Sequence, residues 1–195
     1  MSVKRVLALA SSPRIGGNTD RLLDSFLEGL LPGNREVEKI YLCRLDINPC
    51  LHCGGCLPQG RCVLEDDMET IYRGLAEADV LVFASPVFFG TVSAQAKTVI
   101  DRCQALWVAK VKLGKPIHPV LRPGCFISAA GQDIPGIFDC SLKVVKIFFN
   151  TAQFRLAASV LEPGLDESGD LDRETERLDR ARDRGLSLSE ELTSS

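Results

Sequence analysis

The sequence contains no apolar run that approaches the roughly 20 residues needed to span a bilayer. The apolar stretch at residues 6–10 is also far too short for a secretion signal. With a net charge of −3, the chain lacks a basic cluster interleaved with aromatic residues, which excludes the usual pattern of a nucleic-acid binder. We therefore expect no membrane and no nucleic-acid partner. Since eight cysteines occur without an export signal, we expect a cytoplasmic protein whose thiols are reduced or bind metal.

Short apolar runs alternate with helical patterns, which is typical of repeated βαβ units. Strands are expected at residues 5–10, 37–42, 80–84, 125–129 and 154–161, and the last helix at residues 171–184. This pattern predicts an α/β, flavodoxin-like three-layer sandwich with a five-stranded parallel sheet of order 2-1-3-4-5. With 45% hydrophobic and 25% charged residues, residues 1–195 fit one domain. A cysteine-rich loop is expected at about 47–66 and a polar, frayed tail at about 186–195.

The first strand leads into a glycine-rich loop, SSPRIGGNT at residues 11–19, which precedes a helix. The backbone amides and hydroxyls of such a loop can surround an anion at the helix N-terminus, and Arg14 adds a permanent charge. The loop has neither a Walker A motif nor a G-x-G-x-x-G fingerprint, so a terminal monophosphate fits better than ATP or a dinucleotide. An ordinary strand–turn–helix connection, in which Ser and Thr only cap the helix, is the other interpretation.

Two more loops leave neighbouring strands at the same edge of the predicted sheet. Residues 85–91, SPVFFGT, supply two aromatic rings, a proline and a glycine, which suit a flat ring such as isoalloxazine, although one phenylalanine can equally belong to the core. The turn at residues 129–133 follows the fourth strand and would close the far side of the pocket at the topological switch point.

Four cysteines form a C-x2-C-x2-C-x5-C run at Cys50, Cys53, Cys56 and Cys62. Close spacing of three thiolates with a fourth nearby is typical of iron–sulfur sites, and the spacing predicts one self-contained 4Fe-4S site. Pro49 and three glycines in the run allow a tight fold around it. Zinc, or free or disulfide-forming thiols, are the open alternatives. The scattered Cys43, Cys103, Cys125 and Cys140 are expected to be buried and inert.

Over most of its length the chain resembles the NADPH-dependent FMN reductase superfamily, and within it the iron–sulfur flavoproteins. The resemblance lies in SSPRIGGNT, in SPVFFGTVSAQAKTVIDR and in INPCLHCGGCLPQGRCVLEDDM. It implies FMN bound by two sets of residues and a dimer or tetramer. The phosphate set is Ser11, Ser12, Pro13, Arg14, Gly17, Asn18 and Thr19, and the ring set is Pro86, Val87, Phe88, Phe89, Gly90, Ala130 and Gly131. Relatives often carry a tyrosine or tryptophan where this chain has Phe88 and Phe89, so a hydroxyl or indole contact is absent.

These features predict a flavin-dependent oxidoreductase that passes electrons between FMN and a 4Fe-4S cluster, with no catalytic side chain because the flavin supplies the reactive atom. NAD(P)H is a candidate electron donor, and a ferredoxin or a small molecule is a candidate acceptor. The second hypothesis is a cluster-free NAD(P)H-dependent FMN or quinone reductase. The third is a non-enzymatic electron shuttle or a zinc-stapled binding module.

Overall fold

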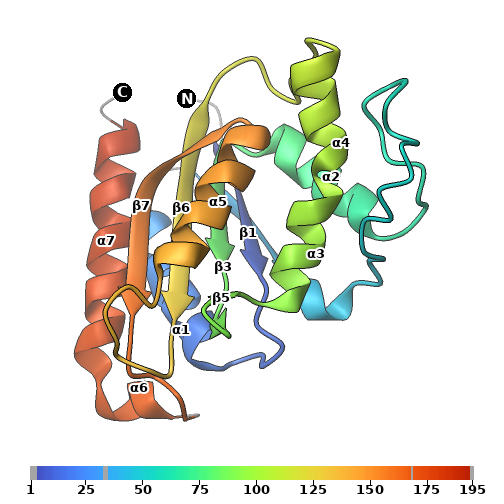
Figure 1. Cartoon of the computed structure of the whole chain (residues 1–195). Coiled ribbons are helices and arrows are strands. Elements are labelled where there is room, and N and C mark those ends of the chain that lie inside the picture. Colours follow the sequence, from blue (N-terminus) through green and yellow to red (C-terminus); the bar gives the residue numbers. More distant parts are fainter. Residues whose placement is uncertain (1–3, 33–34, 168, 194–195) are drawn as a thin grey trace.

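The computed structural model of the chain describes residues 4–32, 35–167 and 169–193. A parallel sheet has the strand order β2-β1-β3-β6-β7. The strands are β1 (Lys4–Ala10), β2 (Arg35–Tyr41), β3 (Val80–Ala84), β6 (Arg122–Ala129) and β7 (Phe154–Glu162), and a separate antiparallel hairpin holds β4 (Val87–Phe88) and β5 (Thr91–Val92). With the hairpin set aside, this is the predicted order 2-1-3-4-5. The expectation of a flavodoxin-like α/β fold is confirmed (Figure 1).

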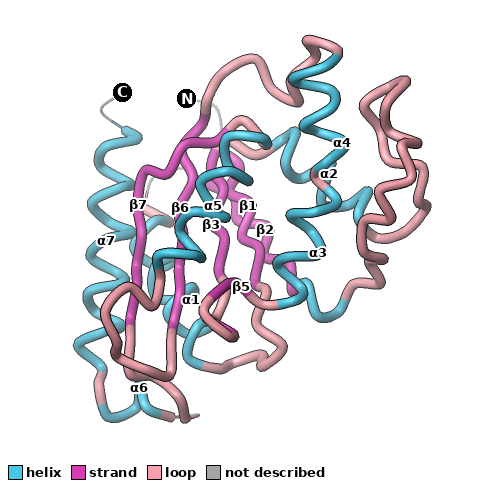
Figure 2. Tube along the Cα trace, viewed as in Figure 1, coloured by secondary structure: helices cyan, strands magenta, loops and turns pink. Residues whose placement is uncertain are grey.

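Helices cover both faces of the sheet (Figures 1 and 2). On one face lie α1 (Asn18–Leu30) and α7 (Thr175–Thr193), and on the other lie α2 (Met68–Glu77), α3 (Ala94–Arg102) and α5 (Asp139–Thr151). Shorter elements are the 3-10 turn η1 (Leu42–Arg44), α4 (Gln104–Trp107), the π-helical η2 (Val108–Lys112) and α6 (Asp170–Arg173). Among the described residues, no helix combines the length and the apolar character that crossing a membrane requires.

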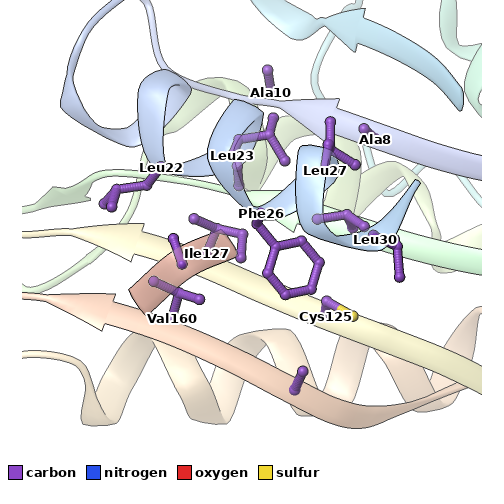
Figure 3. Packing of buried hydrophobic residues seen from close by; sticks show 14 of the residues in the cluster. Ala8, Ala10, Leu22, Leu23, Phe26, Leu27, Leu30, Cys125, Ile127 and Val160 are labelled. Carbon is purple, nitrogen blue, oxygen red and sulfur yellow. The ribbon is translucent and has the colours of Figure 1, made fainter. Parts of the chain in front are cut away.

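The core lies in two layers, one on each side of the sheet. In β1, Val6, Ala8 and Ala10 face α1, whereas Leu7 and Leu9 face the opposite layer, and all five are buried. A strand buried on both faces explains why residues 6–10 form a continuous apolar run. On α1, apolar residues at helical spacing pack onto the sheet, with Phe26 beside Ile127 and Cys125 (Figure 3).

Helix α7 contacts α1 backbone to backbone at two glycines. A Cβ atom on Gly29 would lie 1.9 Å from the carbonyl oxygen of Arg182, and one on Gly185 would lie 2.1 Å from that of Phe26. At its far end α7 reaches the start of β1, where the Lys4 ammonium donates to the Leu192 carbonyl at 2.9 Å. The last helix therefore completes the layer over α1.

The prediction of a frayed tail from residue 186 is wrong for the residues described, because α7 continues to Thr193. Leu188 is buried, and the hydroxyl of the buried Ser189 donates to the Pro32 carbonyl at 2.7 Å. The Arg35 guanidinium in turn donates to the Ser189 hydroxyl at 2.6 Å. These partners come from distant segments, so the polar composition of the tail does not reveal them; residues 194–195 lie outside the described part.

Candidate functional site

The loop before α1 leaves the helix N-terminus open toward a cleft. Gly17 is the N-cap and makes no side-chain cap hydrogen bond, so the first amides of α1 have no such partner. Within the loop, the Arg14 amide donates to the Ser12 hydroxyl at 3.1 Å, and the Gly17 amide donates to the Arg14 carbonyl at 3.1 Å. Free N–H groups and the positive end of the helix dipole form a site for an anion.

The loop conformation depends on a buried carboxylate. Asp20 is 2% exposed and accepts a hydrogen bond from the Gly16 amide at 2.7 Å. Its other oxygen lies 2.6 Å from the ammonium of Lys39. Burial lowers the pKa of Lys39, but hydrogen bonds to Asp20 and Asp24 outweigh burial and raise this pKa above its ordinary value. The lysine thus offsets the carboxylate charge next to the anion site.

The cleft at the carboxyl edge of the sheet has a volume of about 360 Å³ and opens to solvent. Its walls come from the predicted loops and from the segment after β7. The lining residues are Ser12, Arg14, Ile15, Gly16, Gly17, Asn18, Thr19, Pro86, Val87, Phe88, Ala129, Gly131, Leu165 and Asp166. A parallel α/β sheet places its ligand sites at this edge.

Five predicted FMN contacts do not line this cleft: Ser11, Pro13, Phe89, Gly90 and Ala130. Ser11 is fully buried, and its hydroxyl donates to the Ala84 carbonyl at 2.8 Å. Phe89 and Gly90 form the tip of the β4–β5 hairpin with positive φ values of 50° and 78°, and Phe89 is fully exposed. Pro13 is exposed as well.

Ala130 is buried, and its backbone hydrogen bonds hold neighbouring segments of the fold together. Its amide donates to the Glu162 carbonyl at 3.1 Å, and its carbonyl accepts from the Leu165 amide at 2.9 Å. These bonds hold the segment after β7 against the cleft. Its residues Leu165 and Asp166 line the cleft and were not predicted from the sequence. The available signal was their place after a parallel strand, because such positions lie at the ligand-binding edge.

Four buried serines tie the loops of this edge together. Ser93 caps α3, and its hydroxyl donates to the Ser11 carbonyl at 2.9 Å. The Ser93 amide donates to the Ser85 hydroxyl at 2.9 Å, and the Ser128 hydroxyl donates to the Ser85 carbonyl at 2.7 Å. All four are fully buried, so their hydrogen bonds fix the loop positions strongly. Sequence patterns give no sign of this network.

One polar atom in the cleft wall lacks a partner. Asn18 donates through its side-chain amide to the Glu167 carbonyl at 2.9 Å, whereas its buried Oδ1 has no hydrogen-bond partner among the described residues. A buried acceptor without a partner is costly, and a ligand with hydroxyl groups would satisfy it. The cleft therefore fits a phosphorylated, hydroxyl-bearing ligand.

The four predicted cysteine ligands, Cys50, Cys53, Cys56 and Cys62, all line a second cavity of about 120 Å³. The other lining residues come from the end of α3 and the start of α4. The long loop that follows η1 runs beside these helices (Figures 1 and 2). Burial raises the pKa of the Cys56 thiol, and the three neighbouring cysteines raise it further. Within the described residues, no three His, Cys, Asp or Glu side chains are grouped closely enough to hold a single metal ion.

The backbone of this loop turns tightly and packs on a helix. His52, Gly54 and Gly60 have positive φ values, and the Gly60 amide donates to the Cys56 carbonyl at 2.8 Å. A Cβ atom on Gly60 would lie 2.6 Å from that of Ala109, so only glycine permits this close approach. His52 is exposed.

The four cysteines outside the run differ in how far they are buried. Cys103 and Cys125 are buried, as expected, and burial raises the pKa of Cys125 to about 12. Cys140 is exposed near the start of α5, and Cys43 is half-buried, so the expectation of burial is wrong for these two. Amphipathic α5 turns its first residues toward solvent, which a count of apolar residues does not show.

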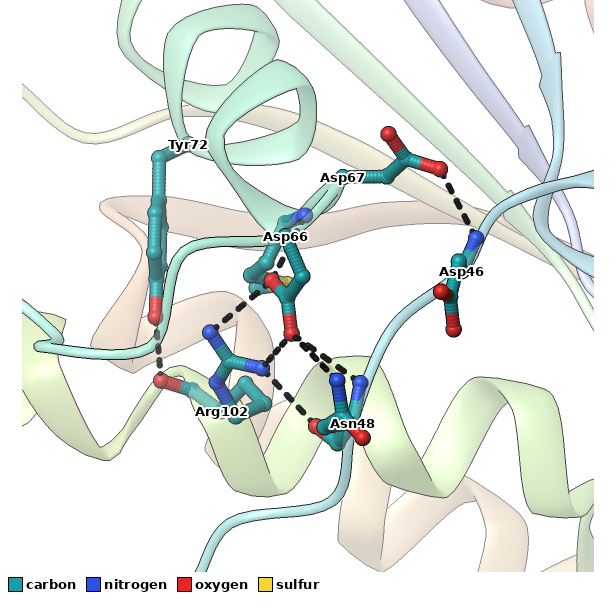
Figure 4. Close-up of polar contacts among 7 residues, drawn as sticks. Asp46, Asn48, Asp66, Asp67, Tyr72 and Arg102 are labelled. Atoms are coloured by element: carbon teal, nitrogen blue, oxygen red, sulfur yellow. Dashed lines mark hydrogen bonds and ion pairs between the residues drawn. The ribbon is translucent and has the colours of Figure 1, made fainter.

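Both ends of the cysteine loop are fastened to the end of α3 (Figure 4). Arg102 and Asp66 form a buried ion pair with nitrogen–oxygen distances of 2.6 and 3.1 Å. Asp66 also accepts from the amides of Asn48 and Met68 at 3.0 and 3.1 Å. Burial raises the pKa of Asp66, but these hydrogen bonds outweigh burial and lower it to about 2.

Asp66→Asn is expected to lower the free energy of unfolding by about 2 kcal/mol near neutral pH. This is the stabilisation that corresponds to the lowered pKa of Asp66 in the folded protein. Because the folded-state pKa lies below its ordinary value, this contribution is present above about pH 4 and disappears as the pH falls toward about 2. Urea unfolding at several pH values should therefore show the two proteins converging in acid. Asp101→Asn, which removes an exposed partner of Lys97, is the control and should differ little from wild type at any pH. A constant difference for Asp66→Asn would contradict the assignment.

The sequence of the chain is similar to those of known proteins. The family model of the NADPH-dependent FMN reductases matches residues 4–152. An iron–sulfur flavoprotein of Methanocaldococcus jannaschii is 34% identical over 146 residues, which cover 74% of this chain and 70% of that protein. One from Archaeoglobus fulgidus is 42% identical over 98 residues, 50% of this chain and 44% of the relative. The chain spans about half the length of most iron–sulfur flavoproteins that it matches.

Solved structures share the fold at lower identity. An NAD(P)H:quinone oxidoreductase from Methanothermobacter marburgensis has a TM-score of 0.72 and 20% identity, with 96% of each chain covered. An FMN-dependent NADH-azoreductase from Bacillus anthracis, solved with FMN, has a TM-score of 0.65 and 16% identity, covering 97% of this chain and 99% of that one. At these identities the likeness shows the fold alone.

Proposed function

Because this chain belongs to the NADPH-dependent FMN reductase family and to its iron–sulfur flavoproteins, we propose that it is a flavin-dependent oxidoreductase that exchanges electrons between FMN and a 4Fe-4S cluster. The observation that carries this proposal is the pair of sites joined by one helix: α3 begins at the serine network of the cleft and ends at the cysteine cavity. When bound, FMN supplies two-electron chemistry and the cluster supplies one-electron chemistry.

The cleft residues supply binding and orientation for FMN. Ser12, Arg14 and the first amides of α1 would hold the phosphate, because they combine a charge, a hydroxyl and free N–H groups. The ring would lie toward Pro86, Phe88 and Gly131, the apolar and backbone part of the wall. No side chain is proposed as an acid or base.

The four cysteines fit a cluster better than a single metal ion. In a 4Fe-4S cluster each iron takes one thiolate, so the ligands surround a body of some size and need not meet at one point. Four thiols around one cavity, with no group close enough for a single ion among the described residues, match that requirement. The electron partners and the dimer or tetramer remain proposals that rest on the family.

Anaerobic purification with analysis of iron, acid-labile sulfide and flavin tests the proposal directly. We expect about four iron and four sulfide per chain, as the cluster requires, together with one FMN. The rival is a cluster-free NAD(P)H-dependent FMN or quinone reductase. FMN without iron or sulfide, combined with rapid stopped-flow oxidation of NADPH, would support that rival instead.

Arg14→Ala is expected to weaken FMN binding roughly 10- to 100-fold, the loss of one charge-assisted hydrogen bond of about 1.5–3 kcal/mol. Riboflavin lacks the phosphate, so its affinity should change little. Fluorescence titration of the flavin-free protein measures both affinities. Arg73→Ala, at an exposed position of α2 outside the cleft, is the matched control. An equal loss for FMN and riboflavin would contradict the phosphate role of Arg14.

A further inference from the structure

We propose that Arg102 is a positioning residue of the cysteine site. Its hydrogen bonds tie both ends of the cysteine loop together, a contact called the clasp below, and its charge raises the reduction potential of the cluster that the loop holds. This inference rests on the proposed function, since it concerns the tuning of the proposed cluster. It is carried by three features of Arg102: its partners, its place in the cavity wall and one unpaired donor.

The partners of Arg102 lie on both sides of the cysteine run (Figure 4). One guanidinium nitrogen donates to the Asn48 carbonyl at 2.8 Å and to Asp66 at 2.6 Å, and the other donates to Asp66 at 3.1 Å. Asn48 precedes Cys50, and Asp66 follows Cys62. One side chain therefore closes the loop at its base, and the Tyr72 hydroxyl, which donates to the Arg102 carbonyl at 2.6 Å, fixes the helix end that carries it.

Arg102 lines the cavity, and Asp66 does not. Arg102 is 1% exposed and lines the cavity together with the four cysteines, whereas Asp66 is absent from the lining. A group bound there would meet the positive end of this ion pair first. The other ionisable side chain in the lining besides the thiols is His52, which is exposed.

The Nε–H group of Arg102 is buried and has no hydrogen-bond partner among the described residues. Leaving a charged donor unpaired is costly, so a partner in the cavity would stabilise the protein. Sulfur atoms of a cluster and its thiolates are such acceptors. Hydrogen bonds to sulfur and nearby charge are the factors that set cluster potentials, and a cation favours the reduced state because reduction adds negative charge.

The decisive measurement is an anaerobic redox titration of the cluster in wild type, Arg102→Gln and Arg61→Gln. Arg61 lies in the same loop but is exposed, so solvent and salt screen its charge. We expect the equilibrium constant for reduction to fall about tenfold in Arg102→Gln, which for one electron is about 59 mV. Arg61→Gln should differ much less from wild type.

Asp66→Asn should shift the reduction potential of the cluster in the opposite direction. This substitution leaves the Arg102 charge without its counter-ion, so the potential should rise, whereas it falls in Arg102→Gln. If Arg102 only held the loop in place, the two substitutions would not shift the reduction potential in opposite directions. Unchanged potentials in both variants, or shifts in the same direction, would overturn the tuning role.

The clasp can be tested by proteolysis, without the cluster. In cluster-free protein, thermolysin should cut the loop near the exposed Leu51 and Leu57 several-fold faster in Arg102→Gln than in Arg61→Gln.

If Arg102→Gln does not fold, Arg102→Lys replaces it. The charge stays but the hydrogen bonding to both ends of the loop is lost, so cleavage should accelerate while the reduction potential stays near that of the wild type. Equal cleavage rates would overturn the clasp. A wild-type protein that binds no iron and sulfide would refute the proposed function, and the proteolysis result would still decide the clasp.

Discussion

A Cys56→Ser variant purified without oxygen will retain FMN but lose most of its iron and sulfide. Cys56 is half-buried, and its thiol interacts with those of Cys50, Cys53 and Cys62, so it lies among the other three proposed ligands. A serine hydroxyl is a much weaker ligand for cluster iron than a thiolate, because it is a hard oxygen donor that stays protonated at neutral pH. The FMN cleft has no wall residue in common with the cysteine cavity, and flavin content should therefore stay near one per chain.

Cys140→Ser is the matched control, because Cys140 is exposed on α5 and lines neither cavity. This variant should keep both cofactors. Iron and sulfide at wild-type levels in Cys56→Ser would reject the proposed ligand set. One zinc per chain in the wild type, lost in Cys56→Ser, would reassign the four cysteines to a structural zinc site.

Gly29→Ala is expected to lower the free energy of unfolding by about 3 kcal/mol, although the same change in an open helix stabilises by about 0.5–1 kcal/mol. The sign reverses because the new methyl group would lie 1.9 Å from the Arg182 carbonyl oxygen. A backbone atom cannot move aside as a side chain can, so α1 and α7 must separate. Urea unfolding followed by circular dichroism measures the loss.

Gly74→Ala makes the same change in α2, where the nearest atoms are the Leu7 side-chain ends at 3.1 Å. These atoms can shift by a few tenths of an ångström, so its loss of stability should be much smaller. A Gly29→Ala protein that is as stable as the wild type would show that α7 does not pack on α1 as described.

Local patterns predicted the sheet order and the loops of the site, because apolar runs and glycine-rich turns are properties of neighbouring residues. The hairpin at residues 87–92, the serine network and the Arg102–Asp66 pair were not predicted. Each depends on residues far apart in the sequence: Arg102 and Asp66 are 36 positions apart, and Ser93 and Ser11 are 82 apart. Side chains of this kind look like ordinary surface polar residues until the fold brings them together.

The same distinction holds within the two sites. The close spacing of four cysteines predicted one shared site, and the structure places all four around one cavity. Ser11 and Ala130 belong to the predicted flavin-binding set, and in the structure both are buried and hold neighbouring segments in place. Loop membership predicts which edge of the sheet a residue reaches, but which way its side chain points depends on the packing beneath it.

The contact between Lys4 and Leu192 brings the two ends of the described chain to the edge of the sheet opposite the cleft (Figure 1). A protein film anchored to an electrode through either end would thus present the flavin site to the electrolyte, where a soluble mediator can reach it. Voltammetry in that orientation would report flavin turnover without the tether obstructing the cleft.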